Sequence, residues 1–302
     1  MGHIRFRATA ISVMCAGALV LGLGPAQAGL FDSSSSTTVS DGTIANIQRA
    51  LDEQRYVDAG TMLDQVLLGS GNDPRLTLLV GQLGLARGHY SDALDNFKSI
   101  DSVARVRARA LEGEGIALSM LGRSDEALPA LQSAVIQEPT AWRAWNVLGT
   151  EYDRRHEWSK ADDAYSHAMS ASNGAAIVLN NRGFSRLSQQ RLDEAVSDFV
   201  AALGKQPDLS AARNNLRLAM AMKGDYDRAL SGSSASERAA ILNNVGYAAM
   251  LRGDYVQARE LLGQAMKARQ DYYALAAANL QLTNDLAASN KGAPEGSNVL
   301  GH

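Results

Sequence analysis

The stretch that decides the fold is Trp145-Asn-Val-Leu148-Gly149-Thr-Glu-Tyr152, followed by Trp158, Ala161, Tyr165 and Ala168. Its apolar residues recur at helical spacing on two short segments that a polar turn separates. Its central glycine belongs to a series in which each member follows the last by 34 residues: Gly81, Gly115, Gly149 and Gly183. A fixed period of this length predicts stacked copies of one unit rather than two independent compact domains.

Each glycine has companions at fixed distances along the chain. An alanine follows it by twelve residues, at Ala93, Ala127, Ala161 and Ala195, and a bulky residue follows that alanine by four, at Phe97, Leu131, Tyr165 and Phe199. Antiparallel helices approach closely only where side chains are small, so we expect glycine and alanine at the crossing of two helices. The bulky residue is expected to fill the gap between one pair and the next. The sequence therefore predicts an all-α solenoid over residues 43–288, with about seven helix pairs and a capping helix.

The period slips once. Arg217 stands where the next glycine is due, and Gly246 follows it by only 29 residues. The missing residues come from the second helix of that unit, which is expected to give way to an irregular segment at 231–236. Ser234 and Glu237 form a capping-box pattern that predicts the start of the next helix. We expect a short helix here and a bend in the solenoid.

The first 28 residues have the features of a signal peptide. Arg5 and Arg7 precede an apolar run at 8–23, and the segment ends at Ala28 in a small-x-small pattern. The run is shorter than the about 20 residues that span a bilayer, so cleavage after Ala28 and a periplasmic location are expected, with a retained leader as the alternative. No membrane span is expected in the mature form.

The remaining terminal segments carry little pattern. Cys15, the one cysteine, is preceded by Ser12 and Met14, which fit a lipobox poorly, so lipoprotein anchoring through Cys15 is disfavoured. Residues 29–42 are predicted to be a flexible linker rich in serine and threonine, and residues 289–302 a disordered tail.

Composition and motifs argue against catalysis. The formal charge is −3, and losing Arg5 and Arg7 with the leader makes it more negative, which disfavours a nucleic-acid-binding surface. The five histidines show no metal-ligand spacing, and Asp162 and Asp163 are neighbours that point to opposite sides of a helix. We therefore expect no enzyme activity, no catalytic residue, no metal and no cofactor.

The period and its residues resemble the tetratricopeptide-repeat family over about residues 43–286. The resemblance implies a right-handed superhelix whose first helices line a concave face, where ligand peptides lie. Asparagines occupy equivalent places on these helices, in one column at Asn146, Asn180, Asn214 and Asn243 and in a second at Asn181, Asn215 and Asn244. Because an amide both donates and accepts, the columns could pair with the backbone of an extended peptide. The alternative is that they bond the neighbouring helix.

One turn further along the same helices lie Phe184, Leu218 and Tyr247. They are candidates for an apolar stripe that accepts partner side chains, and the alternative is ordinary core between repeats. Arg143, Asp153 and Arg154 are interpreted as a solvated face. Paired lysines of the chaperone-tail clamp type are missing from these helices.

Some segments show a more specific resemblance, to the TadD family of Flp (tight adherence, Tad) pilus assembly proteins. They are Leu179-Asn-Asn-Arg-Gly-Phe184 with Ala211-Ala-Arg-Asn-Asn-Leu216 after it, and Ile241-Leu-Asn-Asn-Val-Gly-Tyr-Ala-Ala-Met-Leu-Arg-Gly-Asp-Tyr255. The closing Tyr272-Tyr-Ala-Leu-Ala-Ala-Ala-Asn-Leu280 is similar too. The resemblance implies a periplasmic adaptor whose protein partners include a pilus secretin or other assembly components. The alternative is a general envelope interaction protein that serves outer-membrane or polysaccharide assembly. The sequence makes no prediction of oligomeric state.

Overall fold

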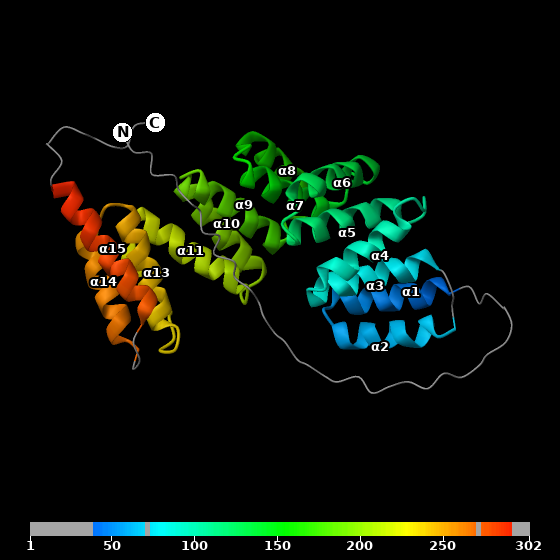
Figure 1. The fold of residues 1–302 in the computed structure, drawn as a ribbon, viewed down its shortest axis with the longest axis horizontal. Coiled ribbons are helices and arrows are strands. Elements are labelled where there is room, and N and C mark those ends of the chain that lie inside the picture. Colours follow the sequence, from blue (N-terminus) through cyan, green and yellow to red (C-terminus); the bar gives the residue numbers. More distant parts are fainter. Residues whose placement is uncertain (1–38, 70–72, 270–272, 292–302) are drawn as a thin grey trace.

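The computed structural model describes residues 39–69, 73–269 and 273–291, and in these ranges every regular element is an α-helix (Figure 1). The fifteen helices are α1 (Asp41–Asp52), α2 (Tyr56–Leu67), α3 (Pro74–Arg87), α4 (Tyr90–Ile100), α5 (Arg107–Met120), α6 (Ser124–Gln137), α7 (Trp142–Arg154), α8 (Trp158–Ala171), α9 (Ala176–Ser188), α10 (Leu192–Lys205), α11 (Ser210–Lys223), α12 (Tyr226–Leu230), α13 (Arg238–Leu251), α14 (Tyr255–Lys267) and α15 (Ala274–Lys291). None of these helices is both long and apolar enough to cross a membrane.

The helices stack as one curved row from α1 and α2 at one end to α15 at the other (Figure 1). Each helix packs against the next in sequence, which gives seven pairs and a final helix. Consecutive first helices, from α1 and α3 to α13 and α15, also contact one another, whereas no two second helices among those described do so. The first helices are therefore crowded on the inside of the curve, and the predicted solenoid is confirmed.

The recurrent glycines lie where the bulky residue of the second helix presses on the first. A Cβ atom at Gly149 would lie 2.6 Å from the ring of Tyr165, and one at Gly183 would lie 2.8 Å from the ring of Phe199. The expectation that the bulky residue fills the gap between pairs is thus incomplete, because its first contact is inside its own pair. Tyr165 also packs against Val178 of the following first helix.

Each turn inside a pair has one residue in the left-handed region, at Gln54, Gly88, Gly122, His156, Gln190, Gly224 and Gly253. This conformation lets the chain reverse at the end of the first helix, and glycine adopts it without steric cost. Three of the seven turns accept a side chain there, which explains why glycine alone does not mark every turn.

The shortened unit differs in a way that the sequence only partly predicts. α12 has five residues, and Arg217, only 9% exposed, reaches across to donate to the carbonyl of Gly232 at 3.2 Å. The arginine thus occupies space that a bulky residue fills elsewhere. Ser234 and Glu237 do pair, at 2.6 Å. The same carboxylate accepts from the backbone amide of Ser234 at 3.3 Å, which is one of the two bonds of the predicted capping box. The Ser234 hydroxyl donates to Glu237 and accepts from no amide of the next helix, and α13 begins at Arg238.

The predicted boundaries need two corrections. Val39 is buried and Ser40 caps α1 by accepting from the Thr43 amide at 3.1 Å, so residues 39–42 belong to the fold and not to the linker. α15 continues to Lys291, past the predicted end at 288. The predictions for residues 1–28, 29–38 and 292–302 fall outside the described residues.

Candidate functional site: the inner face of the first helices

The inner face of the N-terminal half is bridged by its own polar side chains. Asp41 of α1 meets Arg105 at 3.5 Å, and Asp52 at the end of α1 meets Arg143 of α7 at 3.9 Å. Between them, Arg109 of α5 donates to Gln48 of α1. These partners are far apart in sequence and join α1 to the helices two and three pairs away. These polar side chains on the N-terminal half of the inner face are therefore paired with one another.

Burial affects two ionisable groups of this half. It raises the pKa of the Glu112 carboxyl, against the opposing charge of Arg143, and it lowers the pKa of Arg109. Arg143 is exposed, as expected for a solvated face, but it contributes to the bridges described above.

The asparagine columns form a hydrogen-bonded ladder between consecutive first helices. The amide nitrogen of the second column donates to the amide oxygen of the first column on the preceding helix, in Asn181 to Asn146 at 3.2 Å, Asn215 to Asn180 at 3.0 Å and Asn279 to Asn243 at 2.9 Å. The three acceptors are buried. The structure therefore shows the inter-helix bonds of the alternative interpretation, and a ligand role for the three acceptors stays a prediction.

Asn279 is a member of the ladder that the sequence analysis missed. It follows Asn244 by 35 residues, close to the repeat period, inside the segment Ala276-Ala-Ala-Asn279-Leu280. The unit to which it belongs has no glycine marker, and the period was measured on glycines. A search on the asparagine spacing instead would have found it.

The ladder is interrupted between α11 and α13, next to the shortened α12. Among the described residues, no hydrogen bond joins Asn214 to Asn244. Asn244 does accept from Asn243 of its own helix at 3.2 Å, as Asn181 accepts from Asn180 in the intact part of the ladder. Both Asn214 and Asn244 are exposed on the inner face. Of the seven predicted asparagines, these two are the ones that solvent reaches most readily.

The apolar candidates lie beside the ladder and are only partly covered. Phe184 is 50% exposed and Tyr247 is 37% exposed, so neither is ordinary core, whereas Leu218 packs partly into the clusters on both sides of it. The sequence analysis missed Leu282, which occupies the same place on α15 and is 44% exposed. The structure thus places apolar side chains from four first helices in line on the C-terminal half.

The interpretation of Asp153 as solvated is wrong. Its carboxylate accepts from the hydroxyls of Ser185 at 2.6 Å and of buried Tyr165 at 2.8 Å, and burial raises its pKa. Arg154 is half exposed, but its guanidinium donates at 2.5 Å to Glu151, whose side chain is fully buried. Glu151 also accepts from Ser119 of α5 and Ser124 of α6, and Ser185 belongs to α9, so both acids of α7 join adjacent pairs. A single repeat cannot reveal these contacts.

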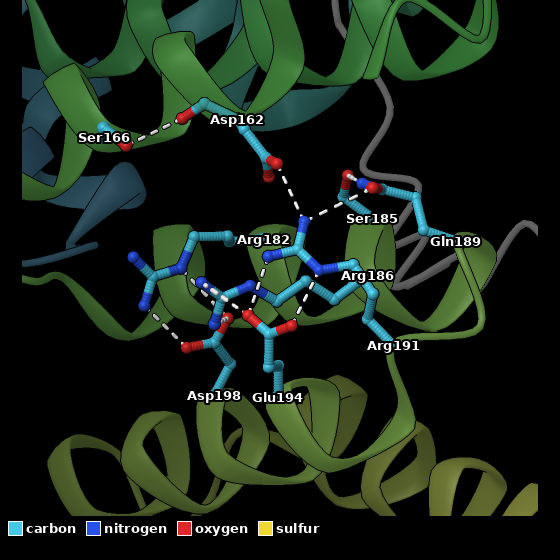
Figure 2. A network of polar contacts seen from close by, with 9 residues as sticks. All are labelled: Asp162, Ser166, Arg182, Ser185, Arg186, Gln189, Arg191, Glu194 and Asp198. Atoms are coloured by element: carbon cyan, nitrogen blue, oxygen red, sulfur yellow. Dashed lines mark hydrogen bonds and ion pairs between the residues drawn. The ribbon is translucent and has the colours of Figure 1, made fainter. Parts of the chain in front are cut away.

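A further polar network ties α8, α9 and α10 together (Figure 2). Arg182 and Arg186 of α9 converge on Asp198 of α10, with closest distances of 2.6 and 2.8 Å. Arg191 lies between Asp162 and Glu194 in the same figure, and its hydrogen bonds to both raise its pKa.

Every carboxylate of this network faces at least one guanidinium group. The network therefore holds the helices together and does not resemble an acid/base pair. Among the described residues, no group of three histidines or acids could hold a metal ion.

Comparisons with known proteins agree with the architecture. A family model for the tetratricopeptide repeat matches residues 113–166. The heat-shock protein cognate co-chaperone sgt12 of Aspergillus fumigatus is 25% identical over 149 residues, which are 45% of this chain and 43% of that protein.

Two solved structures share the fold. A chain in the APC/C hetero-tetramer Cut9-Hcn1 has a TM-score of 0.63 at 14% identity, covering 82% of this chain and 49% of its own. TTC0263, a repeat protein of Thermus thermophilus, has a TM-score of 0.52 at 20% identity, covering 59% of this chain and 97% of its own.

The chain spans less than half the length of the co-chaperone and of the Cut9-Hcn1 chain that it matches. At these identities the solved structures show a shared fold. Proteins of this fold are typically scaffolds without enzyme activity that bind protein partners. The 34-residue period, the family match and the shared fold together support the identification of these helix pairs as tetratricopeptide repeats.

Proposed function

We propose that this protein is a non-enzymatic periplasmic adaptor that binds an extended segment of a protein partner along the inner face of α9, α11, α13 and α15. The observation that carries the proposal is the exposure of Phe184, Tyr247 and Leu282 on three of these four first helices, α9, α13 and α15, beside the exposed amides of Asn214 and Asn244. Aromatic side chains that remain in water beside polar groups are typical of interaction sites.

We further propose that the partner belongs to the Flp (Tad) pilus assembly machinery, with its secretin as the first candidate. The resemblance to the TadD proteins supports this, because two of its segments, 179–184 and 241–255, contribute Phe184, Tyr247 and Asn244. The rival is an adaptor for outer-membrane or polysaccharide assembly.

Site-specific photocrosslinking in intact cells tests the partner. A photoreactive amino acid replaces Phe184 or Tyr247, and Val200 of α10, 52% exposed on a second helix, is the matched control. We expect the two inner positions to capture a pilus secretin or another pilus assembly component, and Val200 not to. Capture of an outer-membrane or polysaccharide assembly protein instead would favour the rival, and the same products from all three positions would contradict the site.

The export part of the proposal has its own test. Osmotic shock should release the protein with the periplasmic fraction, and the mature chain should begin at Gly29. Recovery from the cytosol with residues 1–28 still attached would contradict periplasmic function even if the crosslinks succeed.

A further inference from the structure

We propose that the occupant of this inner face is an extended, uncharged segment of the partner in which an apolar side chain recurs at every third residue. This inference rests on the proposed function and specifies the chemistry of the segment. It uses the apolar column, which we define as the residues at equivalent places on four successive first helices, Phe184, Leu218, Tyr247 and Leu282.

The first argument is charge. The same face of each helix continues about two turns, or seven residues, before the apolar column. The residues there are Ile177, Ala211, Ala240 and Leu275. None of the eight side chains carries a charge, whereas the corresponding face of α1, α5 and α7 presents Asp41, Arg109 and Arg143. A charged residue of the partner would lose water here without gaining an opposite charge, which costs free energy.

The second argument is the backbone of the partner. A helical segment satisfies its own amide and carbonyl groups, whereas an extended segment leaves them unpaired. Asn214 and Asn244 present exposed amides at the interruption of the ladder, next to Leu218 and Tyr247. Each amide can donate and accept, so the site complements an extended backbone and offers a helix nothing comparable.

The third argument is spacing. The apolar column supplies one side chain per first helix, and packed helices lie about 8–10 Å apart. In a polyproline-II conformation every third side chain points to the same side, about 9.3 Å further on. In a β-strand the same-side repeat is two residues, about 6.6 Å, which falls out of step within a few helices. The column therefore fits a period of three.

Binding of synthetic peptides to the purified full chain tests the inference. One fluorescent peptide carries leucine at every third position among serine, glycine and asparagine; a second has the same composition with leucine at alternate positions; a third replaces the polar residues with lysine and glutamate. We expect the first to bind, with an affinity that changes less than about twofold between low and high salt, because no ion pair forms. Equal or tighter binding of either of the others, or no binding of the first, would overturn the inference.

Variants locate the bound peptide. Phe184→Ala and Tyr247→Ala should each weaken binding about tenfold, as expected for an anchoring aromatic residue, and Asn214→Ala about threefold. Val200→Ala is the matched control and should change nothing. Melting temperatures should stay within a few degrees, since these side chains are exposed; unchanged affinity in all three inner variants would reject the site.

The two proposals can fail separately. If no peptide binds but photocrosslinks from Phe184 still capture a pilus component, the segment chemistry is wrong and the adaptor function stands. If the period-three peptide binds at the apolar column while the crosslinks capture no pilus component, the proposed chemistry of the bound segment stands and the pilus assignment is wrong.

Discussion

The substitution Gly149→Ala probes the contact on which the helix pairs depend. In isolation the change should stabilise α7, because alanine is about 1 kcal/mol better than glycine inside a helix. The added methyl group, however, would lie 2.6 Å from the ring of Tyr165, which would have to retreat by about 0.8 Å to reach the 3.4 Å of ordinary contact. That ring is fully buried, and its hydroxyl is held by Asp153 at 2.8 Å.

The net effect of Gly149→Ala follows from these opposing terms. Overpacking a buried site typically costs about 1–3 kcal/mol, and the anchored ring places this site near the upper end. After the gain in helix propensity, we expect a net loss of about 1–2 kcal/mol. Gly263, inside α14, is the matched control, since a Cβ atom there meets nothing within 4 Å. Gly263→Ala should gain up to about 1 kcal/mol.

Thermal unfolding followed by circular dichroism at 222 nm measures both variants. Each kcal/mol shifts the melting temperature by about 2–4 °C at this size, so the two variants should differ by about 2–12 °C, with Gly149→Ala below the wild type. If Gly149→Ala melts at or above Gly263→Ala, the close approach of the two helices is not what the glycine provides, and the packing argument fails.

Three further outcomes are expected. Asp198→Ala leaves the largely buried Arg182 without its carboxylate partner and Arg186 with Glu194 at 3.5 Å, and it should destabilise the protein by about 3 kcal/mol; an unchanged urea midpoint would show that the network contributes nothing. Because burial raises the pKa of Glu112, its ionisation opposes folding, and wild-type stability should fall as pH rises from 4.5 through the raised pKa. Glu112→Gln should therefore melt higher at pH 7 and converge with the wild type in acid, and an equal or lower melting temperature at pH 7 would contradict this. Tyr165→Phe keeps the ring but removes a hydrogen bond to the half-buried carboxylate of Asp153, so we expect a loss of about 1.5–3 kcal/mol by urea denaturation, whereas a neutral result would place that carboxylate in water.

The architecture could be predicted because its determinants recur locally. Gly149 and Tyr165 are sixteen residues apart, and the same spacing returns along the chain, so one local pattern specifies each pair and its repetition specifies the stack. The interruption near Arg217 was visible for the same reason, since a regular period makes a missing turn conspicuous. The predicted capping box before α13 is only half formed, because the Glu237 carboxylate accepts from the Ser234 amide while the Ser234 hydroxyl donates to that carboxylate and accepts from no helix amide.

The candidate site was only partly predictable. The sequence identified Phe184, Tyr247 and the asparagine columns as inner-face residues. Only the structure shows that Asn180 is buried and bonded to the next first helix, whereas Asn214 is exposed to solvent. Nothing in either residue's own repeat distinguishes the two.

By itself the sequence determined the type of unit, the number of pairs and the residues on the inside of the curve, because these depend on spacings within about 34 residues. Only the tertiary structure decided that α1 reaches Arg105 and Arg143 across the inner face, that the half-buried Asp153 accepts from Ser185 of the next pair and that the asparagine ladder is interrupted beside α12. These features arise where different repeats meet, and their contacts depend on the accumulated curvature of the stack, which no single repeat encodes.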